Sequence, residues 1–406
     1  MRICFVSRRF FPTISGMSVY ALNLLRQLVT LGHDVTMISQ YYGGETAGVY
    51  GGGPPPAVPG VKVIGLESVN EQTCGDFEAD VRDIVSAIER EHALTPFDVI
   101  HAQYGYPTGL AGVLAARRLG VCSVVSIQGG DGHWVGECCA THKRAMRDVC
   151  DLADVLLIGS RSFAGEVHGR LGTALDRFTI VPGAVDTDRY TPEIGHVPGR
   201  MKSPPTLLYH GRVDRRKGVL DLLDAFAKLT AAGRDLRLIV SGVGPDLDAV
   251  RAQAVTMPNV EVTGYADYEN TPAVYRRGDV FVSPTYAEGF SNTILEAMAT
   301  GLPIVSCDAV GVVDCLEHER NGLLARVADV DDLARQIARL LDDEKLRLRL
   351  AAEALDECRR VYSWHAIGRQ IDGIYRTLTQ PTTKHDDPLP YRPDEPCRYR
   401  LQPHLL

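Results

Sequence analysis

Short apolar runs alternate with longer segments of helical periodicity along most of the chain. Short apolar runs are typical of strands buried on both faces, and longer periodic segments are typical of covering helices. In the first half we predict strands at 3–7, 35–39, 61–66, 99–101, 121–127 and 155–159. In the second half we predict strands at 207–209, 236–241, 260–262, 280–283 and 304–307. This alternation predicts an α/β protein with mostly parallel sheets and helices on both faces.

The alternation is interrupted at 183–205, a segment rich in proline and glycine that we interpret as a linker between two domains. The N-terminal domain is expected at 1–195, completed by a C-terminal helix at about 364–380, and the C-terminal domain at 200–360. Residues 381–406 contain little apolar sequence and are predicted to be a tail, with a strap packed on the body as the alternative.

Composition narrows the possible functions. Of the 406 residues, 45% are hydrophobic and 23% are charged, as in ordinary globular proteins. The formal net charge of −8 argues against general nucleic-acid binding. No apolar stretch approaches about 18 residues, so we expect no transmembrane helix and no integral membrane association. Ten cysteines without a Cys-x-x-Cys pair, and a first apolar run too short for a signal peptide, favour a cytoplasmic protein.

The segment 286–301, YAEGFSNTILEAMATG, follows a predicted strand and opens a helix. Glu288 lies near the start of this segment, and Glu296 lies within the predicted helix. The backbone N–H groups between them can hold anions or sugar hydroxyls at a helix N-terminus, and an ordinary capped acidic turn is the alternative. The residues that carry these groups are Gly289, Phe290, Ser291 and Asn292.

A second segment, 209–218, reads YHGRVDRRKG and begins where a strand ends. Arg212, Arg215, Arg216 and Lys217 form a dense basic loop in an acidic protein. An arginine and a lysine five residues apart at a strand end can hold a diphosphate, and a solvated basic turn is the alternative. The position between strand and helix favours the diphosphate interpretation.

Neither glycine-rich turn fits a dinucleotide site. Gly16 arrives nine residues after the first strand, and Gly242-x-Gly244 is followed by Pro245 and lacks the third glycine of G-x-G-x-x-G. A redox protein of the Rossmann type is therefore disfavoured.

Four features together resemble the retaining glycosyltransferases of family 4: Gly16, H-G-R-x-x-x-x-K-G at 210–218, V-x-G-x-G-P at 240–245 and E-G-F-S-N-T-I-L-E-A-M-A at 288–299. The resemblance covers about 1–380 in order and spacing. It implies the GT-B architecture, in which two Rossmann-like doubly wound parallel-sheet domains face a central cleft.

The resemblance also implies residue roles. Arg212 and Lys217 match the pair that neutralises the donor diphosphate, and with Glu288, which matches a carboxylate beside the donor sugar, they are the catalytic candidates. Glu296 matches the carboxylate that accepts hydrogen bonds from the ribose hydroxyls. Gly16 matches the glycine that lets the first loop approach the diphosphate. The backbone at 289–292 is expected to hold sugar hydroxyls and phosphate.

The chain departs from the family after strand 121–127, where Gln128 stands in place of the usual histidine. Glutamine exchanges hydrogen bonds but does not titrate. We expect Gln128 to contact the donor sugar and Asp131 or His133 to address the acceptor. His101 is a further acceptor-side candidate, with a buried, hydrogen-bonded histidine as the alternative.

His133, Cys138, Cys139 and His142 raise the alternative of a zinc site. Their spacing does not match common zinc modules, and adjacent cysteines rarely ligate one ion together. We therefore predict no metal ligands, no metal requirement and no cofactor besides the nucleotide sugar.

The resemblance implies transfer of a hexose or N-acetylhexosamine from a nucleoside-diphosphate sugar to a hydroxyl of a small soluble acceptor, as in secondary metabolism. A UDP-linked donor is preferred, with GDP-mannose as the alternative. The sequence offers no obvious nucleophile for a covalent intermediate. The resemblance implies front-face attack, with the leaving phosphate taking the acceptor proton. The alternatives are a GT-B nucleotide-sugar epimerase, which needs no acceptor, and a non-catalytic nucleotide-sugar-binding protein. The oligomeric state is left open.

Overall fold

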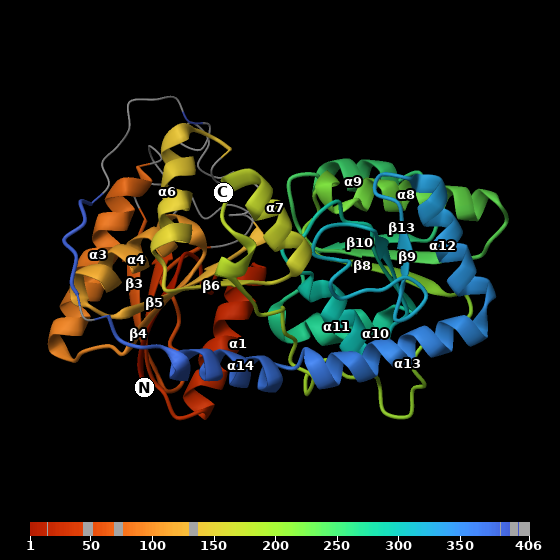
Figure 1. The fold of residues 1–406 in the computed structure, drawn as a ribbon. Helices are drawn as coiled ribbons and strands as arrows, with labels where there is room; N and C mark the ends of the chain where they lie inside the picture. Colours follow the sequence, from red (N-terminus) through yellow and green to blue (C-terminus); the bar gives the residue numbers. More distant parts are fainter. Residues whose placement is uncertain are drawn as a thin grey trace. The chain divides into compact units, whose positions relative to one another are not determined.

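The computed structural model describes residues 1–13, 15–43, 52–68, 76–129, 137–381, 383–389 and 397. The chain divides into two compact units, one formed by Met1–Pro182 with Ile367–Leu406 and the other by Gly183–Ala366 (Figure 1). Each unit is built on one parallel sheet. Within the described residues, no helix combines the length and the apolar character needed to cross a membrane.

The sheet of the first unit has the strand order β3-β2-β1-β4-β5-β6-β7, and all neighbouring pairs are parallel. Its order reverses between β1 and β4, and ligands of such sheets bind at the carboxyl end of the strands near this switch point. The strands are β1 Arg2–Ser7, β2 Asp34–Tyr41, β3 Val61–Glu67, β4 Val99–Gln103, β5 Cys122–Ile127, β6 Val155–Ile158 and β7 Phe178–Ile180.

Helices cover both faces of this sheet. One face carries α3, α4 and α6, and the other carries α1 and the part of α14 from Ile367 onward (Figure 1). Ser15 and Asp76 accept hydrogen bonds from first-turn N–H groups and so begin α1 and α3. The helices are α1 Gly16–Thr30, α3 Phe77–Leu94, α4 Leu110–Leu119, α6 Ala140–Leu152, α7 Arg161–Leu171 and α14 Trp364–Thr377, with short turns η2 Gly105–Gly109 and η3 Leu175–Arg177.

The second unit repeats this design with the order β10-β9-β8-β11-β12-β13, again all parallel, and its switch point lies between β8 and β11. Leu207 and Leu208 belong to the two different cores because successive strand side chains point to opposite faces. The strands are β8 Thr206–His210, β9 Arg237–Ser241, β10 Val260–Gly264, β11 Val280–Ser283, β12 Ile304–Cys307 and β13 Leu323–Ala325.

On this second sheet, α8, α9 and α12 cover one face, and α10, α11 and α13 cover the other (Figure 1). The helices are α8 Val219–Ala231, α9 Leu247–Ala254, α10 Thr271–Arg277, α11 Asn292–Thr300, α12 Val330–Asp342 and α13 Glu344–Val361, with the 3-10 turns η4 Arg215–Lys217 and η5 Tyr268–Asn270. The two parallel α/β sheets confirm the predicted fold class. The short strands β7 and β13 were not anticipated from the sequence.

The segment 183–205, expected as a linker, belongs to the second unit as far as the structure divides it. Val185 donates its N–H to Tyr362 O at 2.9 Å and accepts the N–H of Trp364 at 3.1 Å. These bonds fasten the segment to the end of α13, so the boundary between the units falls after Pro182 rather than near residue 195.

The described residues after α14 form an extended strap on the first unit, which was the alternative to a tail. Gln380 Nε2 donates to Asp98 O at 2.6 Å, and Cys122 Sγ donates to Thr379 O at 3.2 Å. The N–H of His385 donates to Arg117 O at 3.0 Å. The strap is therefore held by polar groups of its backbone and side chains, which do not require a hydrophobic period in its sequence.

Candidate functional site

The switch point of the second sheet is formed by two loops that follow β8 and β11. Gly218 has φ +69°, and a Cβ at this position would lie 2.0 Å from Pro284 O. The N–H of Tyr286 donates to Arg216 O at 3.0 Å. The loops therefore touch backbone to backbone, and glycine at 218 is required both by its conformation and by the close approach.

Asp214 organises the basic loop that follows β8. Its carboxylate accepts the N–H of Arg216 and the Arg216 Nε–H, each at 3.0 Å, and lies 3.2 Å from Arg212 Nε. Burial alone would raise the pKa of Asp214, but the hydrogen bonds and charges of Arg216 and Arg212 lower it to about 2. A permanently ionised, buried carboxylate thus fixes the loop, and Tyr209 OH adds a 2.6 Å bond to Arg212 O.

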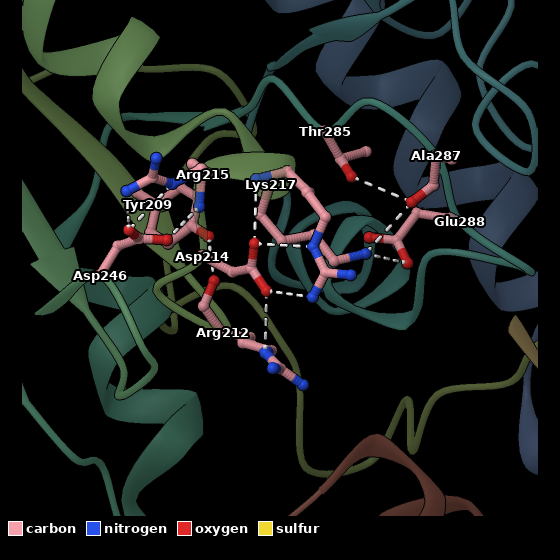
Figure 2. Close-up of polar contacts among 10 residues, drawn as sticks. Tyr209, Arg212, Asp214, Arg215, Lys217, Asp246, Thr285, Ala287 and Glu288 are labelled. Carbon is pink, nitrogen blue, oxygen red and sulfur yellow. Dashed lines mark hydrogen bonds and ion pairs between the residues drawn. The ribbon is translucent and has the colours of Figure 1, made fainter. Parts of the chain in front are cut away.

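The basic side chains of this loop do not share one direction. Arg215 points to Asp246, donating from Nε at 3.0 Å and from Nη2 at 2.7 Å to the same carboxylate oxygen. Lys217 points the opposite way along the edge, toward Glu288 (Figure 2). These two hydrogen bonds engage Arg215 with Asp246, whereas the Arg212 side chain stays 46% exposed.

Lys217 joins the two sequence segments that were predicted to carry chemistry. Its Nζ lies 2.8 Å from Glu288 Oε2 and donates to Ala287 O at 3.2 Å (Figure 2). Thr285 Oγ1 also donates to Ala287 O at 3.2 Å. Both members of the ion pair are partly exposed, with 27% of the Lys217 side chain and 20% of the Glu288 side chain accessible. A cation and an anion thus stand together at the sheet edge where ligands bind.

The N-terminus of α11 lies in the same loop after β11. Ser291 precedes the helix, and its side chain makes no capping bond to a first-turn N–H; its Oγ lies 3.3 Å from Thr293 Oγ1. Helix N–H groups that are not capped by their own side chain can receive an anion. Phe290 packs on the ring of Tyr362 with 5.7 Å between centroids. Asn292 lies against Gly183, and Gly289 follows Glu288 directly in this loop.

Glu296 is on α11, in a half-buried aromatic setting. Tyr275 OH donates to its Oε2 at 2.7 Å. Burial raises the pKa of Glu296 to about 7, against the opposing effect of the hydrogen bond from Tyr275. Tyr275 packs against the rings of Tyr190 and His210, with 5.7 and 5.3 Å between centroids. A carboxylate in this setting changes its hydrogen-bonding capacity near neutral pH.

Sequence reasoning missed Tyr190, Tyr275 and Asp246, which orient or surround these residues. All three lie outside the segments 209–218 and 286–301. Asp246 directly follows the V-x-G-x-G-P motif at 240–245, which was a signal for it, whereas Tyr190 and Tyr275 stand beside no motif. The Arg215–Asp246 and Tyr275–Glu296 contacts join residues far apart in the sequence, and only the fold brings them together.

Gly16 in the first unit is the first residue of α1. Among the residues that the structure describes, none would come within 4 Å of a Cβ at this position. The start of the helix is held by Gln103 Nε2, which donates to Met17 O at 3.0 Å, and by Ser18 Oγ, which donates to Thr13 O at 2.6 Å. These bonds tie α1 to the end of β4 and to the loop after β1.

The other candidate residues of the first unit differ in exposure and in whether the structure describes them. Gln128 follows β5 directly and is partly exposed. Asp131 and His133 lie outside the described residues. His101 is fully buried on β4, and its ring nitrogens are hydrogen-bonded to Tyr375 OH and to Ser126 Oγ. Burial lowers the pKa of His101 to about 3. This is the environment of a buried, hydrogen-bonded histidine, which was the alternative to the acceptor-side role.

Most of the chain matches the models of two known protein families. Residues 15–184 match the model of the family described as glycosyl transferase 4-like domain, and residues 204–343 match that described as glycosyl transferases group 1. The two matches fall on the first and second units and contain both segments of the site.

Individual relatives agree with these families. A D-inositol 3-phosphate glycosyltransferase from Xylanimonas cellulosilytica is 28% identical over 90% of this chain and 92% of its own length. An alpha-D-kanosaminyltransferase from Streptomyces kanamyceticus is 32% identical, but the match spans only 53% of this chain and 55% of that protein. The Anabaena protein Alr3699/HepE, crystallised with UDP and glucose, shares the fold with a TM-score of 0.73 at 16% identity, covering 93% of this chain and 100% of its own.

Proposed function

The chain belongs to the family 4 glycosyltransferases of the GT-B type, and on this premise we propose a donor, an acceptor class and a stereochemical course for it. It transfers a hexose or N-acetylhexosamine from a nucleoside-diphosphate sugar to a hydroxyl of a small soluble acceptor, with retention of the anomeric configuration. UDP is the preferred nucleotide.

The observation that carries this proposal is the Lys217–Glu288 ion pair beside Arg212 at the switch point. Lys217 is partly exposed and is held by a single carboxylate and a carbonyl, so a donor diphosphate replaces Glu288 as its partner. Arg212 supplies a second positive charge. Released from Lys217, Glu288 accepts hydrogen bonds from hydroxyls of the donor sugar.

The reaction breaks the bond between the anomeric carbon and the diphosphate oxygen and forms a bond from that carbon to the acceptor oxygen. The acceptor proton passes to the departing phosphate oxygen on the same face of the sugar. Negative charge grows on the diphosphate as the first bond breaks, and Arg212, Lys217 and the N–H groups at the start of α11 stabilise it. The remaining contribution of the protein is orientation of the two reactants. No metal is needed for this step because the protein's own cations neutralise the diphosphate.

Glu296 is the proposed ribose ligand. Glu296 lies on α11, the helix that begins directly after the loop following β11. Ionised, it accepts hydrogen bonds from the two ribose hydroxyls, while Tyr275 holds it in place. The UDP and glucose bound by a protein of the same fold support a UDP-linked hexose as the donor.

The names of the relatives support a polyhydroxylated acceptor. One relative is named for an inositol phosphate and another for a kanosaminyl transfer. We propose a cyclitol, polyol or sugar as acceptor. Gly16 and Gln128 as donor contacts, and Asp131 and His133 as acceptor contacts, stay predictions from the sequence.

The test is incubation of the full chain with UDP-glucose, UDP-N-acetylglucosamine and GDP-mannose, each with and without a panel of cyclitols, polyols and aminosugars. Nucleotide release is measured, and the anomeric configuration of the product is read by NMR. We expect acceptor-dependent release of UDP, an axial α-linked product from an α-donor, and no loss of rate with EDTA. An inverted product, isomerisation of donor alone, or no turnover of any pair by folded protein would each contradict the proposal.

A further inference from the structure

A cluster of three thiols and one imidazole lies in the first unit, and the proposed sugar transfer uses none of these four residues. Cys138, Cys139 and His142 come from the start of α6, and Cys397 comes from the C-terminal segment. The sulfur and nitrogen atoms of the four side chains all lie within 4.8 Å of one another. None of the three cysteines is in a disulfide. The fold thus brings Cys397 to residues that precede it by about 255 positions.

The separations in this cluster fit one small ion. His142 Nδ1 lies 3.1 Å from Cys138 Sγ and 3.4 Å from Cys397 Sγ. In a tetrahedral zinc site, Zn–S bonds of about 2.3 Å and a Zn–N bond of about 2.0 Å place the ligand atoms roughly 3.5–3.8 Å apart. These two separations are already near the distances that a tetrahedral ion requires, and all the others are at most 4.8 Å.

The backbone explains how two adjacent cysteines reach the same point. Cys139 is the N-cap of α6, with extended φ and ψ, and its Sγ accepts the N–H of His142 at 3.4 Å. Helical side chains tilt toward the N-terminus, so the His142 ring turns back to the cap. The N–H groups of this helix end also stabilise thiolates, which are the forms that bind metal.

The surroundings of His142 are those of a metal ligand. The ring is fully buried, and within the described residues its Nε2 has no hydrogen-bond partner. That nitrogen lies 3.9 Å from Glu78 Oε1, a carboxylate that is 1% exposed and accepts the hydroxyl of Tyr106 at 3.0 Å. A histidine that binds metal through one nitrogen usually donates the N–H of the other to a carboxylate.

We propose that Cys138, Cys139, His142 and Cys397 bind one Zn²⁺ ion that anchors the C-terminal segment to the first unit. Thiolates and imidazole select zinc over magnesium or calcium. Four protein ligands complete the tetrahedron and leave no position for substrate, so the ion is structural and takes no part in sugar transfer. The proposal does not rest on the identity of donor or acceptor.

This proposal differs from the sequence prediction of no metal because the fourth ligand changes. Sequence spacing offered His133, whereas the structure brings Cys397 from the end of the chain. Cys139 also borders an open surface hollow lined by Glu137, Ala140, Lys143 and Arg170, so this ligand of the cluster is accessible from solvent.

The first experiment measures zinc by elemental analysis in the full chain, expressed in zinc-supplemented medium and purified without a polyhistidine tag or chelator. We expect about one zinc per chain. Cys397→Ser and Cys138→Ser should each lose most of it. Cys122→Ser is the matched control, since Cys122 also contacts the C-terminal strap but lies outside the cluster, and it should keep the zinc. His133→Ala should keep it as well; loss of zinc in this variant would overturn the assignment of Cys397.

A second measurement avoids variants that fail to fold. Cobalt added to the metal-free wild-type chain should give the intense sulfur-to-cobalt absorption and the visible bands of a tetrahedral thiolate site. Glu78→Gln should weaken zinc binding by about 10- to 100-fold, because it removes the carboxylate facing His142. Less than about one tenth of a zinc per chain with no cobalt spectrum, or a disulfide between Cys397 and Cys138 or Cys139 in freshly purified protein, would overturn the proposal.

Discussion

The two sheets have the same strand order at their switch points but use the carboxyl edge in opposite ways. In the second unit, the edge between β8 and β11 presents charged side chains that are partly exposed, among them Arg212, Lys217 and Glu288. In the first unit, the polar side chains at the ends of β1 and β4 are buried and bond to one another: Ser7 Oγ donates to Gln103 Oε1 at 3.1 Å.

This difference shows that topology fixes where a ligand can bind and that the loop residues decide what is bound. Ion pairs at a partly exposed edge can be exchanged for a charged ligand at modest cost, whereas buried hydrogen bonds cannot be broken without leaving unpaired groups. The second unit is therefore suited to hold a diphosphate, and the described edge of the first unit serves mainly to position α1.

The sharpest way to break this comparison is to remove the exchangeable cations. Arg212→Ala and Lys217→Ala should each lower kcat by about 100-fold or more, because each removes a positive charge from the departing diphosphate. Steady-state release of the nucleotide measures the effect. Lys228→Ala, which removes an exposed lysine paired with Asp331 on the same unit, should leave kcat unchanged. Unchanged kcat in both Arg212 and Lys217 variants would contradict the diphosphate assignment.

The next effect concerns donor affinity. Glu296→Gln should weaken UDP binding by about 10-fold or more, because the charged acceptor of the ribose hydroxyls is lost. Burial raises the pKa of Glu296 to about 7, so the carboxyl gains a proton as the pH falls through that value. Calorimetry should find UDP bound up to about 10-fold more weakly at pH 6 than at pH 8 in the wild type.

The Glu296→Gln variant is the control for the pH dependence of UDP binding. Its glutamine does not titrate, so the variant should bind UDP with little dependence on pH. Glu261→Gln, on the exposed side of β10, should bind like the wild type. A wild-type affinity that is flat between pH 6 and pH 8 would rule out the ionised carboxylate as the ribose ligand.

His101 tests the other side of the comparison, where burial should govern stability rather than catalysis. His101→Phe should lower the free energy of unfolding by about 1–3 kcal/mol, because Tyr375 and Ser126 lose their partner. Burial lowers the pKa of His101 to about 3, below its unfolded value, so its contribution to stability is present above about pH 6.5 and is lost as the pH falls toward 3.

Urea unfolding at several pH values measures this contribution, and kcat at pH 7.5 should stay within about twofold of the wild type. A large fall in kcat with unchanged stability would instead return His101 to an acceptor-side role.

The smallest expected effect is at Gln128, where the first unit is predicted to reach the donor sugar. Gln128→Ala should lower kcat/KM by about 2- to 10-fold, the value of one neutral hydrogen bond. Gln128→His, which restores the residue usual in the family, should retain activity. Full kcat/KM in the alanine variant would show that Gln128 makes no productive contact, and the first unit would then contribute less to the donor site than the sequence predicts.

Much of the fold and the main site segments could be predicted because they depend on local properties. Apolar runs and helical periods identified most strands and the parallel α/β class. Two motifs, at 209–218 and 286–301, lay at strand ends, and the order β10-β9-β8-β11 of the second sheet places the ends of β8 and β11 side by side. The Lys217–Glu288 pair follows from that order.

The class of fold, the family and the charged segments could be predicted from the amino-acid sequence. The partners of the side chains became evident only in the folded chain: Arg215 contacts Asp246, Lys217 pairs with Glu288, and Tyr275 donates to Glu296. The structure likewise buried His101 in the core and brought Cys397 to the start of α6.

The physical reason is the range of the interactions. Hydrophobic periodicity and the preferences of turn residues involve only a few neighbouring residues, so they can be recognised in the sequence. Contacts between residues far apart in sequence depend on which strands become neighbours and on which side chains are desolvated there. The sequence records only the type of a residue. The protonation state, hydrogen bonds and ligands of a carboxylate, histidine or cysteine depend on the groups that the fold places within a few ångströms of it.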